Sequence, residues 1–592
     1  MPKDMAIAIT QNIRQFRQAW LCRRASPSWV FYARACGLGV LLAAAYPPFP
    51  FGFLAYAGLI PFLYWMRGES ASMPKGMTLP KAFKLGYWWG FGFHTAGLYW
   101  INVSTVLGGV SALLFLPVFS AVTLLLCRSL YRNYGTISVF FFPFLWTAVE
   151  YIRSLGVLAF PWMNIGYTQT YYLPMVQFAE YLGVHGVVFW LCVINVVLFI
   201  LIEQARSIMP KTQAMPFGKV IAALINMKTG SLAVIAIALL IVPWIYGKSV
   251  IDAGEYRGDS IKVALIQGHI DTEIKKNAEY REENYRIYEQ LTLRAAEEEP
   301  DLIVWPETST LAYIRIAYQW QHRFRSIAQL AGAPVLAGSP DVIFLEDGSY
   351  KPLNSAVLLN RFDENFDEAQ WYAKMRLVPL GEWFPYEDRF SFLENIDFGQ
   401  GNFKPGTDYT IFSLERRKSR EMAMLFGAEA SGSEVSSPVD SVQFSVAVCF
   451  ESIFPDFIRI FCKAGSRFLV VVSNVAWFGR TTSLYQHPQI GVFRAIENRI
   501  GVAHCSNSGI SVLIDPYGRV TDKSSVYKKE ILIGRTYFRD NAAQMTFFTR
   551  NGDLIGPLSA VISTVLLLAG LITGCRRKGK AGKPGPSAQT SV

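Results

Sequence analysis

Long uncharged stretches alternate with short basic stretches over the first 250 residues of the chain. Eight apolar runs are candidates for membrane spans. They lie at 31–46, 51–66, 83–102, 107–127, 134–153, 184–203, 231–248 and 554–574. A helix that crosses a bilayer needs about 20 mostly apolar residues, so the first two runs fit least well. The pattern predicts a multi-pass α-helical membrane domain with about eight transmembrane helices.

Basic residues collect in alternate connections between these runs. The connections that contain lysine or arginine include Arg67, Lys75, Lys81, Arg128, Arg132, Arg206, Lys211, Lys219 and Lys228, whereas 47–50 and 103–106 contain no basic residue. Positive charge favours the cytoplasmic side, so the two basic tails, 1–28 and 575–592, are expected in the cytoplasm. Basic residues beside membrane spans orient the spans and contact anionic lipid headgroups, which accounts for the net charge of +11. No nucleic-acid partner is therefore expected.

Residues 255–540 follow a different pattern, in which short apolar runs alternate with amphipathic ones. Strands are expected at 261–267, 302–305, 334–337, 355–359, 444–449, 468–473, 501–505 and 512–514, and helices at 277–299 and 485–499. Such alternation is typical of an α/β domain with layered sheets covered by helices. The expected division is a basic tail (1–28), seven spans (29–250), an outer domain (255–540), an eighth span (554–574) and a disordered tail (575–592). Residues 416–440 are interpreted as an insertion.

Three polar residues stand at or near the ends of apolar runs in this outer domain: Glu307, Lys374 and Cys449. Ligand sites in open α/β sheets gather at the carboxyl ends of strands, so the three side chains are expected to converge. A lone cysteine in an apolar run is more often a small core residue. The domain has three cysteines and no C-x-x-C pair, so neither a disulfide framework nor a metal site is indicated, and no cofactor is expected.

The motifs around these residues resemble a known family. W-P-E-T-S (305–309), K-M-R-L-V-P-L-G-E-W-F-P (374–385) and V-C-F-E-S (448–452) resemble the nitrilase superfamily. Together with the predicted membrane spans, these motifs make the chain similar to the apolipoprotein N-acyltransferase family, which is a branch of that superfamily. The resemblance implies a nitrilase-like αββα sandwich on the periplasmic face of the bacterial inner membrane, above eight transmembrane helices, with both termini in the cytoplasm.

The resemblance also implies a reaction. Family members move an acyl chain from a phospholipid, typically phosphatidylethanolamine, to the N-terminal amine of a diacylglyceryl-cysteine in an apolipoprotein. Carried over to this sequence, Cys449 is the nucleophile that holds the acyl group as a thioester, Glu307 is the base, and Lys374 stabilises the oxyanion. These roles agree with the chemistry of the residue types, because a thiol must lose its proton before it attacks an ester.

Further residues match the family motifs or depart from them. Supporting roles are expected for Glu382, Glu451 and Phe450, and substrate contacts for Gln267, Trp383, Asn474 and Trp477. Three positions depart from the usual pattern: Phe450 replaces a tyrosine, Lys276 a tryptophan and Val475 an aspartate. His487 and His504 are expected to be hydrogen-bonded structural histidines, since no metal-ligand spacing joins them.

Two other functions are compatible with parts of the pattern. A membrane-tethered amidase of the nitrilase type would use the same three residues on a small amide, but a single anchor would suffice for it. A transporter or non-catalytic lipid-binding protein would need the many spans but not the three polar residues. Acyl transfer is the function that requires both features.

Overall fold

The structure is a computed structural model of the chain. It describes residues 28–68, 77–208, 227–252, 258–271, 278–346, 348–360, 366–384, 402–415, 441–538 and 545–581. Lys276 and the stretches 1–27, 416–440 and 582–592 lie outside the described residues. Residues 575–581, which were predicted to belong to a disordered tail, instead form the end of helix α20 (Ile555–Ala581).

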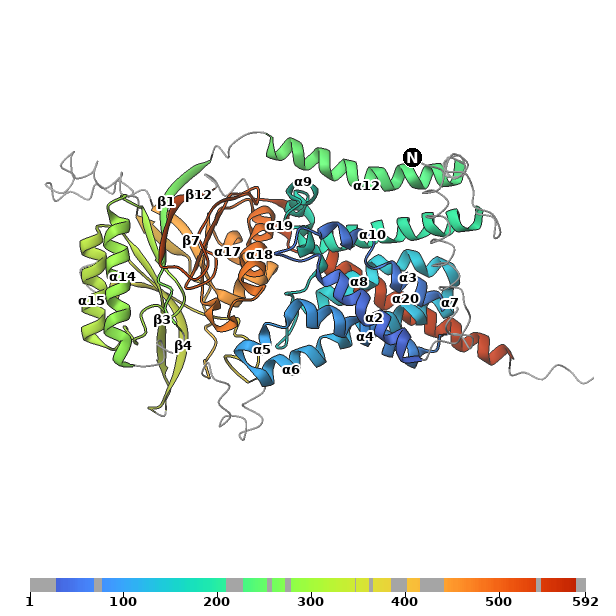
Figure 1. Ribbon diagram of the computed structural model, residues 1–592, viewed down its shortest axis with the longest axis horizontal. Helices are drawn as coiled ribbons and strands as arrows, with labels where there is room; N and C mark the ends of the chain where they lie inside the picture. Colours follow the sequence, from blue (N-terminus) through green and yellow to red (C-terminus); the bar gives the residue numbers. More distant parts are fainter. Residues whose placement is uncertain are drawn as a thin grey trace, which may run out of the picture.

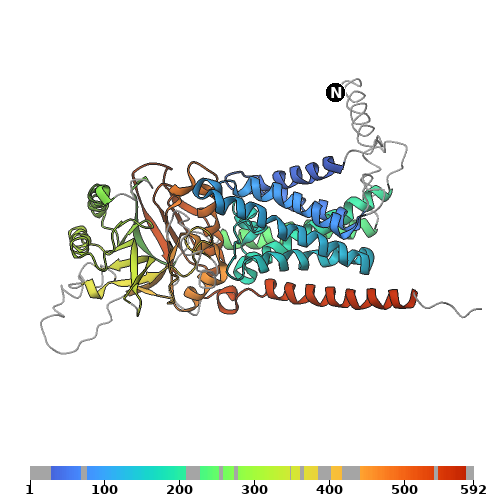
Figure 2. The same cartoon turned by 90° about the horizontal axis from the view of Figure 1, so that it is seen from below.

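A helical part and an α/β part lie end to end along the longest axis of the molecule (Figure 1). The long helices of the helical part run roughly along the same axis, and α20 extends along one side of the bundle (Figure 2). The helical part comprises α2 (Ser28–Ala43), η1 (Gly52–Tyr56), α3 (Ile60–Arg67), α4 (Leu79–Leu98), α5 (Ile101–Ser104), α6 (Val106–Phe115), α7 (Pro117–Tyr134), η2 (Gly135–Phe141), α8 (Phe142–Arg153), η3 (Ile165–Gln169), α9 (Leu173–Val176), α10 (Ala179–Ile208), α12 (Met227–Ile251), α19 (Phe547–Asn551) and α20 (Ile555–Ala581).

Four helical stretches among the described residues are long and apolar enough to cross a membrane. They are Val106–Arg153, Ala179–Ser207, Gly230–Ile251 and Ile555–Thr573. The first stretch contains α6, α7 and α8 in succession, and its 48 residues exceed the length that one crossing requires. The structure therefore supports a helical membrane part, while the number of eight spans stays a prediction.

The predicted helix at 51–66 does not form as one element. This stretch contains the short 3₁₀ helix η1 and the eight-residue helix α3. Gly58 and Pro61 lie at the break, and Pro61 occupies the first turn of α3, where its missing N–H group is tolerated. At 1.5 Å per residue α3 is about 12 Å long, so it cannot cross a bilayer alone.

Two six-stranded sheets form the centre of the α/β part. Their strand orders are β12-β1-β2-β3-β4-β5 and β11-β10-β9-β8-β7-β6. In each sheet, the three strands β1–β3 or β7–β9 are parallel, and antiparallel strands flank them. The strands are β1 (Asp259–Gln267), β2 (Leu302–Trp305), β3 (Val335–Phe344), β4 (Tyr350–Leu359), β5 (Gln370–Ala373), β6 (Phe412–Glu415), β7 (Ser441–Val448), β8 (Leu469–Ser473), β9 (Val502–Ser506), β10 (Val512–Ile514), β11 (Val520–Lys523) and β12 (Glu530–Phe538).

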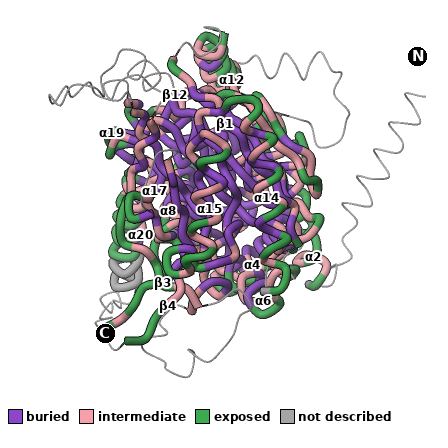
Figure 3. The backbone as a smooth tube through the Cα atoms, turned by 90° about the vertical axis from the view of Figure 1, so that its left-hand side faces the viewer, coloured by how far each residue is buried: buried purple, intermediate pink, exposed green. Residues whose placement is uncertain are grey.

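Helices cover the outer faces of both sheets. Figure 1 shows α14 (Arg281–Ala296) and α15 (Tyr318–Ala331) on one outer face, and α17 (Pro455–Lys463) and α18 (Ser483–Asn498) between the second sheet and the membrane helices. Strand β1 illustrates the packing: Val263 and Leu265 belong to one buried cluster, whereas Ala264 and Ile266 belong to another with α14 and α15. Such alternation follows from the two-residue period of a strand. Buried residues fill the centre of the end view (Figure 3), and the predicted αββα sandwich is confirmed.

Candidate active site

The nucleophile candidate lies at the end of a buried strand. Strand β7 ends at Val448, and Cys449 begins the 3₁₀ helix η8 (Cys449–Ile453). Its φ of 51° is a left-handed conformation that a residue with a Cβ adopts only at a cost of order 1–3 kcal/mol. Strain of this kind persists only where surrounding contacts impose it, and it turns the thiol out of the strand direction.

Glu307 reaches the same place from the other sheet. It follows β2 by two residues, and its loop packs against Gly338 in β3. A Cβ at position 338 would lie 2.5 Å from the Glu307 Cα, so only glycine permits this close approach. The carboxylate accepts hydrogen bonds from Asn354 Nδ2 at 2.8 Å and from the Asn474 backbone N–H at 2.9 Å.

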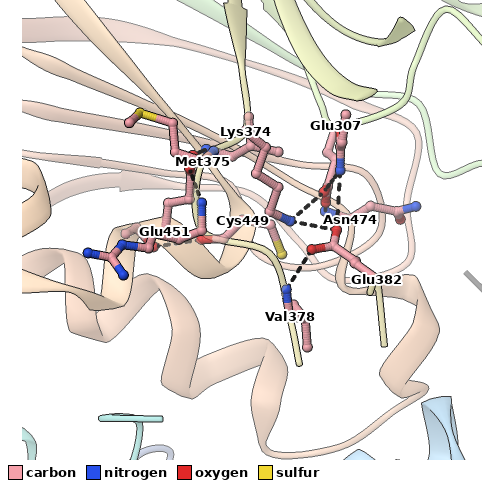
Figure 4. Close-up of polar contacts among 12 residues, drawn as sticks. Glu307, Lys374, Met375, Val378, Glu382, Cys449, Glu451 and Asn474 are labelled. Carbon is pink, nitrogen blue, oxygen red and sulfur yellow. Dashed lines mark hydrogen bonds and ion pairs between the residues drawn. The ribbon is translucent and has the colours of Figure 1, made fainter. Parts of the chain in front are cut away.

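Lys374 lies between two carboxylates. It follows β5, and its ammonium group is 2.7 Å from Glu382 Oε1 and 3.4 Å from Glu307 Oε1. Figure 4 shows the Lys374 amine directed toward both carboxylates and beside the Cys449 sulfur. Although burial opposes protonation, the carboxylates of Glu382 and Glu307 raise the pKa of Lys374 above its usual value. The side chain is therefore a buried ammonium cation at neutral pH.

The thiol of Cys449 is protonated in this resting arrangement. Burial raises the pKa of Cys449 well above its usual value, the Glu307 charge raises it further, and Lys374 acts in the opposite direction. Because only the thiolate attacks an ester, the thiol needs a base at the moment of reaction. Glu307 and Cys449 line the same cavity, and Glu307 stays the predicted base.

Glu451 connects the segment that bears Lys374 to the strand that bears Cys449. Its carboxylate accepts hydrogen bonds from the backbone N–H groups of Met375 and Val448, at 2.7 and 2.8 Å, and from the Tyr372 hydroxyl at 2.7 Å. The side chain is fully buried. Burial raises the pKa of Glu451 to about 7, against the lowering effect of these hydrogen bonds. Glu451 thus positions the lysine segment and does not face the reacting atoms (Figure 4).

The polar cluster opens into a cavity of about 380 Å³. Its polar end is formed by Glu307, Thr308, Asn354, Lys374, Glu382, Cys449, Asn474 and His487. The rest is mostly apolar and combines residues of both parts of the chain: Trp100, Ile101, Ala112, Phe115, Leu116, Leu158, Phe160, Trp162, Val378, Leu380, Phe403, Phe450, Trp477 and Phe478. A long apolar chain with a polar end group fits such a cavity.

The predicted substrate contacts divide into two pairs. Asn474 and Trp477 line the cavity. Gln267 does not, because its fully buried amide is engaged with Ser511, Ser524 and the backbone carbonyls of residues 525 and 528. Trp383 is half-buried and is not among the lining residues; it pairs with Pro379 in an isolated β-bridge. The prediction for Gln267 followed a motif match, but its geometry indicates a structural role.

At two of the three positions that depart from the family motif, the apolar residue is buried in apolar surroundings. Phe450 is buried and stacks on Phe160 of the helical part, with ring centroids 5.7 Å apart. Val475 is buried beside Gly509, where a Cβ on the glycine would lie 2.3 Å from the valine side chain. The third departure, Lys276, lies outside the described residues.

Asn354, which the sequence did not single out, and His487 complete the site. Asn354 donates to Glu307 and, at 3.3 Å, to Glu382. His487 Nε2 lies 3.0 Å from the Cys449 carbonyl oxygen and 3.0 Å from Ser452 Oγ. His487 was expected to be a hydrogen-bonded histidine, but its place against the nucleophile was not foreseen. These contacts have no local sequence signal, because each joins residues that lie far apart in the chain.

Gln486, on helix α18 next to His487, holds two tryptophans of the helical part. Gln486 Oε1 accepts hydrogen bonds from the indole N–H groups of Trp162 and Trp100, at 2.9 and 3.2 Å. The Trp162 ring also packs on His487, with ring centroids 5.3 Å apart. The apolar wall of the cavity and the nucleophile are therefore both held by the first turns of α18. In the described part of the chain, no cluster of three or more His, Cys, Asp or Glu side chains is arranged to hold a metal ion.

Comparisons with known proteins cover both parts of the chain. Residues 38–197 match the family model "Apolipoprotein N-acyltransferase N-terminal domain", and residues 262–537 match "Carbon-nitrogen hydrolase". The apolipoprotein N-acyltransferase of Geobacter metallireducens is 33% identical over 537 residues, which are 88% of this chain and 92% of the relative. That of Chlorobaculum tepidum is 26% identical over 90% of this chain and 95% of the relative.

Among solved structures, a mutant of the nitrilase-superfamily amidase of Nesterenkonia AN1 covers 50% of this chain and 95% of its own, at 18% identity and a TM-score of 0.34. The apolipoprotein N-acyltransferase relatives match both parts of the chain over nearly their full length, and the motifs at Glu307, Lys374 and Cys449 meet in one site. The chain therefore belongs to the apolipoprotein N-acyltransferase family.

Proposed function

We propose that this protein transfers an acyl chain from a phospholipid, with phosphatidylethanolamine as the expected donor, to the N-terminal amine of diacylglyceryl-cysteine in an apolipoprotein. The observation that carries the proposal is the cavity, which joins Glu307, Lys374 and Cys449 to an apolar wall from the helical part. This arrangement brings a thiol nucleophile to a lipid ester, and the family membership supports the same reaction.

In the first half-reaction, Glu307 accepts the thiol proton as the Cys449 sulfur attacks the ester carbonyl carbon of the donor. The carbonyl oxygen becomes an oxyanion, which the Lys374 ammonium stabilises. Loss of one oxyanion donor typically lowers kcat by about 10²–10³. When the tetrahedral intermediate collapses, the C–O bond breaks and Glu307 returns the proton to the departing lysophospholipid oxygen. The products are a lysophospholipid and an acyl thioester on Cys449.

In the second half-reaction, the neutral amine of the acceptor attacks the thioester carbonyl carbon. Lys374 again stabilises the oxyanion, and Glu307 removes a proton from the nitrogen. The C–S bond breaks, an amide is formed, and the sulfur of Cys449 takes the proton from Glu307. One carboxyl group thus serves as base and acid in turn, as general acid–base catalysis requires.

The proposal includes a topology. Eight spans, with the domain at 255–540 on the periplasmic side of the bacterial inner membrane and both tails in the cytoplasm, agree with the distribution of basic residues. The boundaries proposed for the helical part are 29–250 and 554–574. The carboxyl-terminal parts of α7 and α10, which carry Arg128 and Arg206, would then face the cytoplasm, and labelling of single cysteines from either side of a vesicle can test this.

The decisive experiment follows the acyl group by intact mass. Purified protein is incubated with phosphatidylethanolamine, and a hydroxylamine-sensitive acyl adduct is expected on the wild type but not on Cys449→Ala. A diacylated lipopeptide is then added, and the adduct should disappear as the triacylated product forms. An amidase would not triacylate the lipopeptide, and a lipid-binding protein would form no adduct. Triacylation by Cys449→Ala would exclude the proposed nucleophile.

A further inference from the structure

A second cavity, here called the junction cavity, lies where the helical part meets the α/β part. Its volume is about 340 Å³, and its lining shares no residue with that of the active-site cavity. Helix α18 lies between the two: Gln486 and His487 face the active site, whereas Pro488 and Val492 line the junction cavity. The mechanism proposed above makes no use of it.

The junction cavity combines apolar lining residues with one basic side chain, a combination that suits an anionic lipid. Its floor is apolar, with Pro488, Val492 and Val512 among its residues. Lys523, an exposed residue of β11, is the charged side chain among the residues that line it. Thr170 also lines the cavity, but this residue is 2% exposed and its hydroxyl oxygen is buried, so the hydroxyl is not presented to a ligand.

The position of the junction cavity corresponds to the headgroup level of a bilayer. Leu173, which lines it, begins α9, and α9 packs closely on the end of α12, where a Cβ at Gly247 would lie 1.8 Å from the Pro174 carbonyl oxygen. The flank of α12 is apolar and exposed at Trp244 and Ile245. Exposed Tyr171 and Tyr485 line the cavity itself, and such aromatic side chains favour the membrane–water interface. Figure 1 shows α9 between α12 and the α/β part.

We propose that the junction cavity binds a phospholipid that is not the acyl donor. The phosphate contacts Lys523, and an acyl chain covers the floor along Val492 and Val512. A lipid in this place seals the junction on the side of α18 opposite the nucleophile. It is bound without any covalent step, so the proposal does not depend on acylation of Cys449.

The test is native mass spectrometry of the full chain, carrying Cys449→Ala, in detergent with phosphatidylglycerol as the probe. Addition of Lys523→Glu should weaken one bound lipid by about tenfold or more, because one basic group at an anionic surface is worth about fivefold in affinity and the substitution reverses the charge. Lys528→Glu is the matched control: it makes the same charge change at an exposed position outside the lining, and lipid binding should not change.

A second variant tests the cavity itself. Val520→Trp places a large ring at a half-buried lining position on an outer strand of the sheet, and it should remove the same bound lipid while thermal unfolding stays cooperative. Equal lipid binding by the parent, Lys523→Glu and Val520→Trp would overturn the proposal. A diacylated lipopeptide without phosphate that displaces this lipid, with no loss on Lys523→Glu, would also overturn it. Failure of Cys449 to form a thioester would count against the acyl transfer function alone.

Discussion

Replacement of Lys374 by methionine tests the electrostatic core of the active site. The lysine is 1% exposed, and it separates Glu307 and Glu382, which are 6% and 4% exposed. Without the ammonium group, the two buried carboxylates keep the Asn354 amide between them, at 2.8 and 3.3 Å, but lose the positive charge that offsets their repulsion. Removal of one partner from a buried ion pair costs about 3–5 kcal/mol. Since a domain is stable by only about 5–15 kcal/mol, we expect a clear fall in Tm.

The same substitution removes the donor to the oxyanion. We expect acyl adduct formation on Cys449 to slow by about 10²–10³, which corresponds to roughly 3–4 kcal/mol of transition-state stabilisation. A loss of folded protein would give a similar result, so a second variant is needed. Lys374→Met combined with Glu382→Gln removes one of the two carboxylates, and it should recover most of the lost Tm without recovering the rate.

The assay is single-turnover adduct formation by intact mass, at a temperature at which every variant is folded by circular dichroism. Glu382→Gln alone keeps the Lys374–Glu307 pair and supplies the reference rate for the double variant. If the double variant acylated Cys449 as fast as Glu382→Gln, Lys374 would not stabilise the oxyanion. If its Tm stayed as low as that of Lys374→Met, repulsion between the carboxylates would not be the cause of the instability.

Three further predictions follow from the same geometry. Glu307→Gln should slow both half-reactions by about 10²–10⁴, measured as adduct formation and as transfer from a preformed thioester. Gln486→Leu leaves two buried indole N–H groups unpaired and should lower the free energy of unfolding by roughly 2–4 kcal/mol, whereas Leu at exposed Gln329 should have little effect. Burial lowers the pKa of His487 from 6.5 to about 4. The folded state then binds fewer protons than the unfolded state, and stability should fall by roughly 3 kcal/mol as the pH drops from 6.5 to 4; urea titrations of His487→Asn should show a smaller fall.

The sequence predicted the elements whose signals are local. The eight expected strands are all present, because each is a short apolar run buried on both faces. Four strands were missed: β5, β6 and β11 have only four residues each, and β12 is largely half-buried with mixed polarity. Their pairing depends on partners distant in sequence, such as β12 with β1, so no local pattern marks them.

The sequence predicted those active-site residues that belong to a recognisable motif, and missed those that do not. Glu307, Lys374 and Cys449 were expected to converge, and they line one cavity in which Glu382 contacts the lysine; their catalytic roles stay predictions. The residues that fix their geometry were not identified, since Asn354 lies within a strand and His487 on a helix, each in an ordinary local context. Gln267 was predicted to contact substrate from its motif position, but its amide is engaged with Ser511, Ser524 and two backbone carbonyls and it does not line the cavity.

The helical part changes what a nitrilase-like active site can do. A hydrolase must admit water to its acyl-enzyme, whereas here the wall beside Cys449 is built from Phe160, Trp162 and Trp100 of the helical part, with Phe450 stacked on Phe160. Gln486 holds the two tryptophans. Apolar walls favour an acyl chain over water, so under the proposed function this wall is expected to shield a thioester on Cys449 from water. We therefore propose that the membrane-side wall, and not Glu307, Lys374 and Cys449 alone, decides between acyl transfer and hydrolysis.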